Sequence, residues 1–326
     1  MKDKPLVSVI LPTYNGAECI AEAIQSVLDQ TYPNIELIVV DDGSTDGTKA
    51  IVESFSDKGV QFVAKPKNSG IADSLNVGIL QAKGQYFARM DDDDVCMPER
   101  LMAQVEFLEQ HPDVVVCATN DQNKGGDRPY LTDTELKIGL LFRNVIIHAS
   151  VMMPMEVIKK YMYTVDMVPS EDYDLWSRLL NEGKFYKLEA PLMFIRYSAD
   201  GQTATRRHEQ LHLNVGIFKR IARCYGFNWD EAYESAVFKY IGHDYSMPAY
   251  TLLKLIEWFE QLLTQNNIKG MFPKSTFENE LRYQENTFVT KYFYNRTLKD
   301  KIMPFIKLPL RLKLQVVKFY LNKHNA

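Results

Sequence analysis

The sequence is poor in cysteine, has no long apolar run and carries no excess of positive charge. Its four cysteines, among 326 residues, include no Cys-x-x-Cys pair. This spacing argues against a disulfide framework or a zinc site and favours reduced thiols. No stretch reaches the ~18 apolar residues expected of a membrane-spanning helix, and residues 1–15 lack the apolar core of a signal peptide. We therefore expect a cytoplasmic protein, either in solution or at the inner face of the cell membrane.

The net charge of −4 is unevenly distributed along the chain. Residues 291–326 contain nine Lys and Arg against one acid, Asp300, so they carry a charge of +8 and residues 1–290 carry −12. The acidic body argues against a nucleic-acid partner. The basic end indicates contact with an anionic surface, most simply a membrane.

The basic end also shows the periodicity of an amphipathic helix that begins at Pro309. Four apolar residues share one face of that helix: Leu310, Leu314, Val317 and Leu321. Four polar residues share another face: Arg311, Gln315, Lys318 and Asn322. Two interpretations stay open. Residues 301–323 make a peripheral membrane contact, or the helix packs on the body or on a neighbouring subunit of a homodimer.

Short β-branched segments alternate with helical patterns over the first 120 residues. The predicted strands are Val7–Leu11, Ile35–Val40, Val60–Ala64, Tyr86–Met90 and Val114–Ala118. Apolar residues at helical spacing lie between them, as at Ile20, Ile24 and Val27. This alternation predicts an α/β fold with a mostly parallel mixed sheet flanked by helices, in which ligands bind beyond the carboxyl ends of the strands.

The rest of the chain changes character near residue 206. Residues 120–205 contain a turn-rich loop, helical patterns over Thr134–Phe142 and Glu171–Asn181, and short strands. From residue 206 onward the pattern is helical, with few turn residues. We therefore predict an α/β domain over residues 1–205 and a helical C-terminal region over residues 206–326.

Two runs of acidic residues directly follow the second and fourth predicted strands. They are residues 41–46 (DDGSTD) and residues 91–94 (DDDD), at the edge of the sheet where ligands bind. Two like charges ~4 Å apart repel by on the order of 4 kcal/mol at an effective dielectric constant of about 20. A divalent cation relieves such crowding, and Mg²⁺ or Mn²⁺ typically takes one or two carboxylates plus substrate phosphates. Asp91 and Asp93 together favour a metal, whereas helix capping stays open for Asp46 and Asp94.

Five segments, in this order, resemble glycosyltransferase family 2, the inverting nucleotide-sugar enzymes of GT-A fold. They are residues 7–16 (VSVILPTYNG), 40–48 (VDDGSTDGT), 68–94, 98–101 (PERL) and 171–176 (EDYDLW). The resemblance covers about residues 5–200 and is of the bacterial surface-polysaccharide type. It implies a Rossmann-like GT-A domain that carries a nucleotide-sugar donor site.

The resemblance assigns roles to individual residues. The implied donor-binding residues are Pro12, Thr13, Tyr14, Asn15, Asp42, Asn68, Asp91, Asp92 and Arg196. Within this set, Asp42 faces the base, Asp91 lies on the ribose side and Asp92 only adds negative charge. Many relatives carry a His two residues after an Arg near the end of the domain. Here Ser198 takes that position after Arg196, so the His that lies close to the diphosphate in those relatives is absent from this position.

The resemblance also implies the chemistry of the site. Asp93, with Asp91, is expected to ligate a Mn²⁺ or Mg²⁺ ion at the donor diphosphate, where a cation stabilises the negative charge left by sugar departure. Asp172 is predicted to be the general base that takes the proton of the acceptor hydroxyl, with Glu171 as its rival. Capping of a helix by Asp172 is compatible with that role.

His148 and Trp176 are the predicted acceptor-side residues. A histidine satisfied within the core stays open for His148, and plain packing stays open for Trp176, which has helical spacing with its apolar neighbours.

Together these implications predict an inverting transferase that moves a sugar, UDP-linked as first choice, to a glycan or lipid-linked glycan in surface-polysaccharide synthesis. One alternative is a metal-dependent nucleotidyltransferase, but residues 12–16 lack the basic residues of a triphosphate loop. The other is a non-catalytic sugar- or partner-binding module, against which the presence of Asp91, Asp93 and Asp172 counts.

Overall fold

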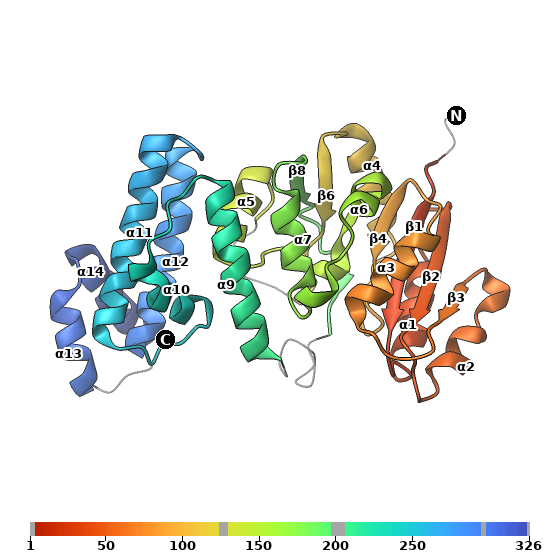
Figure 1. Ribbon diagram of the computed structural model, residues 1–326, viewed down its shortest axis with the longest axis horizontal. Helices are drawn as coiled ribbons and strands as arrows, with labels where there is room; N and C mark the ends of the chain where they lie inside the picture. Colours follow the sequence, from red (N-terminus) through yellow and green to blue (C-terminus); the bar gives the residue numbers. More distant parts are fainter. Residues whose placement is uncertain (1–3, 124–129, 197–205, 295–297, 325–326) are drawn as a thin grey trace. The chain divides into compact units, whose positions relative to one another are not determined.

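The computed structural model describes residues 4–123, 130–196, 206–294 and 298–324 of the chain. The chain forms two compact units, coloured along the sequence in Figure 1. The sheet unit comprises residues 1–137 and 144–210, and the helical unit comprises residues 138–143 and 211–326. Within the described ranges, no helix combines the length and apolar character that a membrane crossing requires. The domain boundary between residues 205 and 206 stays a prediction.

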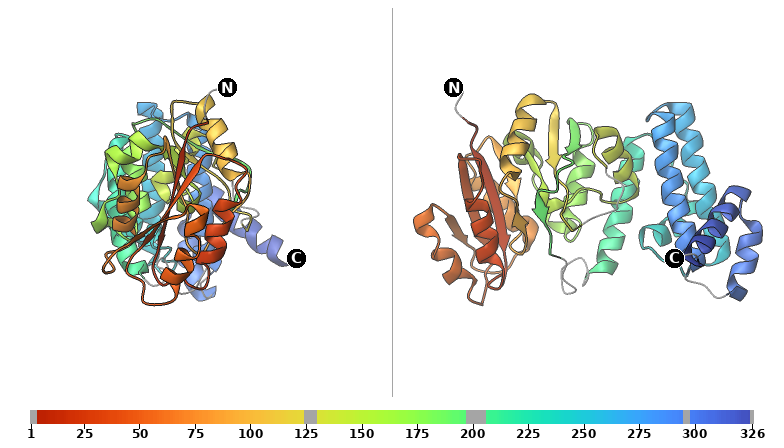
Figure 2. Two further views of the ribbon diagram at one scale, coloured as in Figure 1. Left: turned by 90° about the vertical axis from the view of Figure 1, so that its right-hand side faces the viewer. Right: turned by 180° about the vertical axis from the view of Figure 1, so that it is seen from behind.

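A seven-stranded mixed sheet forms the centre of the sheet unit (Figure 2). Its strands, in spatial order, are β3 (Gln61–Ala64), β2 (Ile35–Asp41), β1 (Val7–Thr13), β4 (Tyr86–Arg89), β7 (Met152–Pro154), β6 (Val114–Ala118) and β8 (Lys184–Lys187). The first four strands are parallel, β7 runs antiparallel to both of its neighbours, and β6 pairs parallel with β8. The expected mostly parallel mixed sheet is therefore confirmed.

Helices cover both faces of this sheet. α1 (Ile20–Leu28), α2 (Thr48–Glu53) and α4 (Arg100–Gln110) share a hydrophobic core with Val9 of β1. Ile10, the next residue along β1, points to the opposite face, because side chains alternate along a strand. There it lies against Gly78 of α3 (Ile71–Gln81). Every residue of β1 is buried, as expected of a central parallel strand covered on both sides.

The remaining described elements before residue 206 are helices, 3₁₀ turns and a two-stranded ribbon. The helices are α5 (Asp133–Phe142), α6 (Met155–Tyr161) and α7 (Glu171–Leu179), with short 3₁₀ turns at Ser56–Lys58, His148–Ser150 and Val165–Met167. A two-stranded antiparallel ribbon pairs β5 (Val95–Cys96) with β9 (Met193–Phe194). The sequence pattern did not predict β5. This ribbon brings residue 196 next to the end of the second acidic run.

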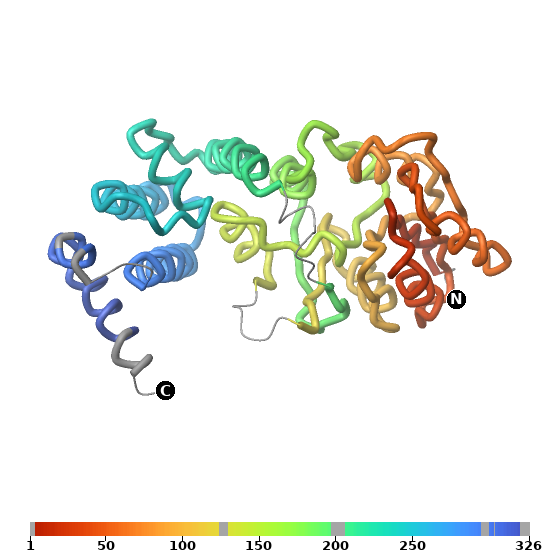
Figure 3. The backbone as a smooth tube through the Cα atoms, turned by 90° about the horizontal axis from the view of Figure 1, so that it is seen from below, coloured from red at the N-terminus to blue at the C-terminus, as the bar shows by residue number. Residues whose placement is uncertain are grey.

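Besides residues 138–143, the helical unit contains six helices among the described residues, and the first of them starts in the sheet unit. They are α9 (Arg207–Cys224), α10 (Glu234–Ile241), α11 (Ala249–Lys269), α12 (Lys274–Tyr294), α13 (Leu298–Lys307) and α14 (Leu310–His324), with a 3₁₀ turn at Glu231–Tyr233. The long helices α11 and α12 pack side by side and are seen nearly end-on in Figure 3. Aromatic side chains fill the core between helices, and Trp258 makes an edge contact with Phe218 at a centroid distance of 5.6 Å.

Candidate active site

The two acidic runs lie at the same edge of the sheet. In the parallel pairing of β1 with β2, Thr13 is in register with Asp41, the last residue of β2. In the pairing of β1 with β4, Ile10 is in register with Arg89, the last residue of β4. The loops that follow β1, β2 and β4 therefore emerge together, which is where a parallel sheet binds its ligands.

The loop after β1 is tied to the loop after β2. The backbone amide of Asn15 donates to the Ser44 hydroxyl at 2.8 Å, and the Asn15 side-chain oxygen accepts from the Thr45 amide at 2.9 Å. Gly43 has a φ of +77°, and a Cβ there would meet the Lys67 backbone at 2.8 Å, so only glycine fits. The side chain of Tyr14 remains 48% exposed, so it can contact a ligand.

Asp42 is fully engaged within the protein. Its Oδ1 lies 2.6 Å from the Lys65 ammonium and accepts from the Ser69 amide at 2.9 Å, while its Oδ2 accepts from the Gly70 amide at 2.7 Å. Asp42 therefore holds the loop that carries the exposed Asn68. Its contact with a base, implied by the family resemblance, stays a prediction.

The second acidic run is arranged differently. Asp91, Asp93 and Asp94 each place a carboxylate oxygen within 4.8 Å of those of the other two. The Asp93 carboxylate accepts no hydrogen bond from another residue of the described ranges. The Asp94 carboxylate accepts one, from the Arg196 backbone amide at 3.0 Å. The sequence left helix capping open as the role of Asp94. In the structure its carboxylate lies with those of Asp91 and Asp93, the two predicted metal ligands.

Electrostatics set this run apart as well. Burial, together with the negative charge of Asp91, raises the pKa of Asp93 and the pKa of Asp94 above the usual range. Burial raises the pKa of Asp92 to about 6, against the opposing hydrogen bond from the Thr13 hydroxyl at 2.5 Å. The run holds more negative charge than its surroundings compensate. Three crowded oxygen donors of this kind fit a hard divalent cation such as Mg²⁺ or Mn²⁺.

Asp92 and Thr13 connect the run to the first loop. Asp92 was expected only to add charge, but its hydrogen bond to Thr13 fixes the loop after β1 against the end of β4. A Cβ on Gly16 would overlap the Asp92 carboxylate. The segment 12–16 and the acidic run therefore form one rigid arrangement.

Arg89 is a central residue that the sequence analysis missed. Arg89 is 2% exposed, and its guanidinium contacts the Asp91 carboxylate at 2.5 Å. Its Nε and Nη1 atoms find no hydrogen-bond partner among the described residues. Its charge acts on Glu171, on Asp172 and on the metal-site candidates. An arginine at the buried end of a strand, directly before a run of acids, is the sequence signal that could have identified it.

Glu171 and Asp172 start α7, where the helix dipole favours negative charge. Asp172 is the more accessible of the two. One of its oxygens accepts from the Asn144 side chain at 2.6 Å, and the other accepts from the Tyr173 amide at 2.6 Å. Burial raises the pKa of Asp172, and burial together with the charge of Asp172 raises the pKa of Glu171. Asn144, which the sequence analysis did not single out, therefore orients Asp172, the predicted base.

His148 and Trp176 lie behind this pair of acids. His148 Nε2 lies 2.8 Å from the Tyr163 hydroxyl, and Nδ1 lies 3.9 Å from Glu171. Burial and the charge of Arg89 hold the pKa of His148 well below its usual range, so the ring is neutral. Trp176 is fully buried, with its ring centroid 6.0 Å from that of His148. This is the packing that the sequence left open for Trp176.

Arg196, two residues after β9, reaches the acidic run. Its guanidinium donates to the Asp93 carbonyl at 3.0 Å and pairs with Glu22 of α1. In this structure its side chain supports the run, and its expected phosphate contact stays a prediction. Ser198 lies outside the described residues.

Comparison with known proteins identifies the family to which the chain belongs. A sequence profile described as glycosyl transferase family 2 matches residues 8–160. An uncharacterised glycosyltransferase of Haemophilus influenzae is 32% identical over 229 residues, which cover 64% of this chain and 71% of that protein.

Solved structures show the same fold. TarS of S. aureus (residues 1–349), crystallised in complex with UDP-GlcNAc, superimposes with a TM-score of 0.57 at 17% identity, over 97% of this chain and 89% of that one. The mannosyltransferase PcManGT of Pyrobaculum calidifontis, in complex with GDP-Man and Mn²⁺, gives a TM-score of 0.58 at 18% identity, over 91% and 89%. From the profile and the Haemophilus relative, the chain belongs to glycosyltransferase family 2.

Proposed function

We propose that the protein transfers a sugar from a nucleotide diphosphate, most simply UDP, to an acceptor hydroxyl with inversion, and that it requires Mn²⁺ or Mg²⁺. The observation that carries this proposal is the convergence of the Asp91, Asp93 and Asp94 carboxylates at the end of β4. The UDP-GlcNAc bound by TarS and the GDP-Man and Mn²⁺ bound by PcManGT support a nucleotide-sugar donor and a metal.

The three carboxylates would hold the ion, and a cation there stabilises the charge that develops on the departing diphosphate. The chain's own groups then bind and orient the donor. Tyr14 offers an exposed ring beside a loop that Asn15 and Thr13 hold rigid. Arg89 keeps the run together because its charge offsets part of the crowding of the carboxylates.

We assign the role of general base to Asp172. Its accessible carboxylate, held by Asn144 and by the Tyr173 amide, retains lone pairs for an acceptor hydroxyl. A pKa raised by burial makes it a stronger base than an ordinary aspartate. Glu171 is more buried and lies beside the neutral His148, which favours a supporting role.

We extend the proposal to a glycan or lipid-linked glycan acceptor in surface-polysaccharide synthesis, at the inner face of the cell membrane. Two features support this extension: the family resemblance and the charge of +8 over residues 291–326.

A thermal-shift screen of nucleotides and nucleotide-sugars, with Mn²⁺ or with EDTA, tests the donor and the metal together. A ligand at 100 times its Kd adds about 2.7 kcal/mol to the free energy of unfolding. We expect metal-dependent stabilisation by one nucleoside diphosphate and its sugar conjugate. Preferential stabilisation by a triphosphate would instead favour a nucleotidyltransferase, and no response to any nucleotide would favour a non-catalytic module.

Replacement of the base separates binding from turnover. Asp172→Asn keeps the size of the side chain and removes its basicity, so turnover should fall by roughly 10²–10⁴-fold while donor affinity changes little. Glu171→Gln is the matched control. If Glu171→Gln lost turnover and Asp172→Asn kept it, the role of base would move to Glu171.

A further inference from the structure

The last two helices expose large aliphatic side chains, which form a row along α14. Five of them are between 44% and 71% exposed: Ile302, Ile306, Leu310, Leu314 and Val317. In α14, Leu310, Leu314 and Val317 follow at helical spacing and share one face. Single exposed apolar residues are ordinary on a protein surface, whereas a contiguous group marks an interaction site.

This row is not the surface by which α14 packs on the protein. The inward face of α14 carries Leu312 and Val316, which are 0% and 4% exposed, and Leu308 just before the helix is 3% exposed. Leu310, Leu314 and Val317 of the apolar face expected from the sequence therefore point outward, and a second set of apolar residues, which the periodicity did not single out, packs inward.

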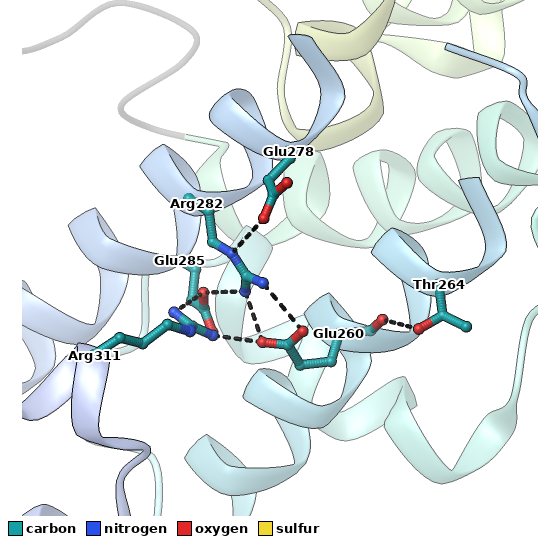
Figure 4. A network of polar contacts seen from close by, with 6 residues as sticks. All are labelled: Glu260, Thr264, Glu278, Arg282, Glu285 and Arg311. Atoms are coloured by element: carbon teal, nitrogen blue, oxygen red, sulfur yellow. Dashed lines mark hydrogen bonds and ion pairs between the residues drawn. The ribbon is translucent and has the colours of Figure 1, made fainter. Parts of the chain in front are cut away.

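An ion-pair network holds α14 in this orientation. Arg311 contacts Glu260 of α11 at 2.6 Å and Glu285 of α12 at 2.7 Å, and Arg282 of α12 bridges the same two acids (Figure 4). Glu285 is fully buried. The sequence placed Arg311 on the polar face of the helix. In the structure its guanidinium pairs with acids of α11 and α12 within the helical unit.

Further lysines of α13 and α14 accompany these aliphatic side chains. Residues 298–324 contain seven Lys and Arg against the single acid Asp300. Lys307, Lys313 and Lys318 form no ion pair with any residue of the part of the chain that the structure describes. In α14, Lys313 and Lys318 lie on either side of the Leu310 and Leu314 row by helical spacing. Aliphatic groups flanked by lysines match an interface between acyl chains and anionic headgroups.

We propose that this α13–α14 face, made of the five aliphatic residues with Lys307, Lys313 and Lys318, docks on the surface of an anionic lipid bilayer. A second copy of the chain fits it less well, because a twofold contact would set the lysines of one face against those of the other. The lysines and the aliphatic side chains act together on a membrane: the first attract the headgroups and the second enter the acyl boundary.

Co-sedimentation of the full-length chain with vesicles tests the proposal. The probe is vesicles of equal parts phosphatidylcholine and phosphatidylglycerol, compared with pure phosphatidylcholine. We expect binding to the anionic vesicles that weakens as salt is raised. Leu310→Glu with Leu314→Glu should lower the partition constant by at least about tenfold. Lys313→Gln with Lys318→Gln should lower it about fivefold for each lysine removed.

Matched controls lie elsewhere in the chain. Ile268→Glu changes an aliphatic residue that is 79% exposed on α11, and Lys274→Gln removes an exposed lysine of α12. Both controls should bind vesicles like the unmodified chain, and circular dichroism should show equal helix content in every variant. Vesicle binding needs neither donor nor metal, so it stands or falls separately from the proposed transferase activity.

Three outcomes would overturn the proposal. They are no binding to anionic vesicles, equal binding by Leu310→Glu with Leu314→Glu, and equal loss of binding in the controls. A dimer in sedimentation equilibrium that the leucine substitutions dissociate, without vesicle binding, would assign the face to a second copy. Binding to an acidic protein instead of vesicles would likewise contradict a lipid partner.

Discussion

The two acidic runs, residues 41–46 and residues 91–94, both follow strands of the same sheet and look alike in the sequence. In the first run, every carboxylate is satisfied by nearby donors. Asp41 accepts from the Ser44 amide and hydroxyl, Asp42 from Lys65 and two amides, and Asp46 from Thr48 and the Ala17 amide. In the second run, the acids face one another with few donors.

The difference shows what distinguishes a structural acid from a candidate metal ligand. Burial acts to raise the pKa of Asp46, but hydrogen bonds from Thr48 and Ala17 lower it below the usual range. In the second run, burial and neighbouring negative charge raise the pKa values of Asp92, Asp93 and Asp94. The local supply of donors, and not the density of acids in the sequence, distinguishes the candidate cation site from the run of structural acids.

The largest expected effect is a loss of activity that should differ between substitutions in the two acidic runs. Asp93→Asn should lower kcat/KM by about a thousandfold, because it removes an oxygen that holds the cation opposite the developing negative charge. Asp46→Asn, the matched change in the other run, should stay within a few-fold of the unmodified enzyme. Steady-state kinetics with saturating Mn²⁺ measure both. Equal losses in the two variants would remove the distinction between the runs.

The next effect concerns Arg89, a buried cation in contact with the second run. Arg89→Met should lower the free energy of unfolding by about 3 kcal/mol in EDTA, because it leaves Asp91 and Glu171 without a compensating charge. Arg89→Lys, which keeps the charge and loses the planar fork, should lose less. Added Mn²⁺ should recover part of the Arg89→Met loss, which a purely packing role would not produce. Denaturant unfolding with and without metal decides this.

A third effect follows from the pKa of Asp92, which burial raises to about 6. Between its unfolded value near 4 and this folded value, the folded chain binds more protons than the unfolded one, so Asp92 makes stability fall as pH rises. Asp92→Asn, which mimics the protonated acid, should match the unmodified protein near pH 4. In EDTA at about pH 8 it should be more stable, by on the order of 3 kcal/mol. Chemical denaturation at both pH values is the measurement, and a variant less stable at about pH 8 would contradict it.

The smallest effect belongs to the first run and has the opposite sign. Asp46→Ala removes the acceptor of the Thr48 and Ala17 amides near the start of α2, and should cost about 1 kcal/mol at neutral pH. This loss should disappear as the pH falls through the folded pKa of Asp46, because a lowered pKa stabilises only the ionised state. The loss of stability in Asp46→Ala should be the same with and without Mn²⁺. A loss that metal reverses would place Asp46 at the cation site.

Much of the fold followed from local pattern. The predicted strands at Val7, Ile35 and Tyr86 start where the structure has them, because buried parallel strands leave continuous β-branched runs in the sequence. The insertion of antiparallel β7 between β4 and β6 did not follow, since pairing between distant segments leaves no local signal. Helix α14 was expected, but which of its two apolar sets packs inward depends on α11 and α12, as Arg311 shows.

The candidate site likewise contains residues that the sequence could identify and residues that it could not. Asp91 and Asp93 could be singled out because four consecutive acids after a strand are hard to place otherwise, and the structure brings them together with Asp94. Arg89 was missed although its place directly before the acidic run was visible in the sequence. Asn144 could not be singled out, because its importance lies in a contact to Asp172 that only the fold creates. The role of Asp172 as base, and that of each donor residue, stays a prediction.

The claim that the 91–94 run is a divalent-cation site can be tested most directly by calorimetric titration of Mn²⁺ into the protein with saturating UDP. The account predicts one saturable ion per chain, an affinity reduced at least about tenfold in Asp93→Asn, and an unchanged affinity in Asp46→Asn. Tight binding retained by Asp93→Asn, or lost in Asp46→Asn alone, would contradict it.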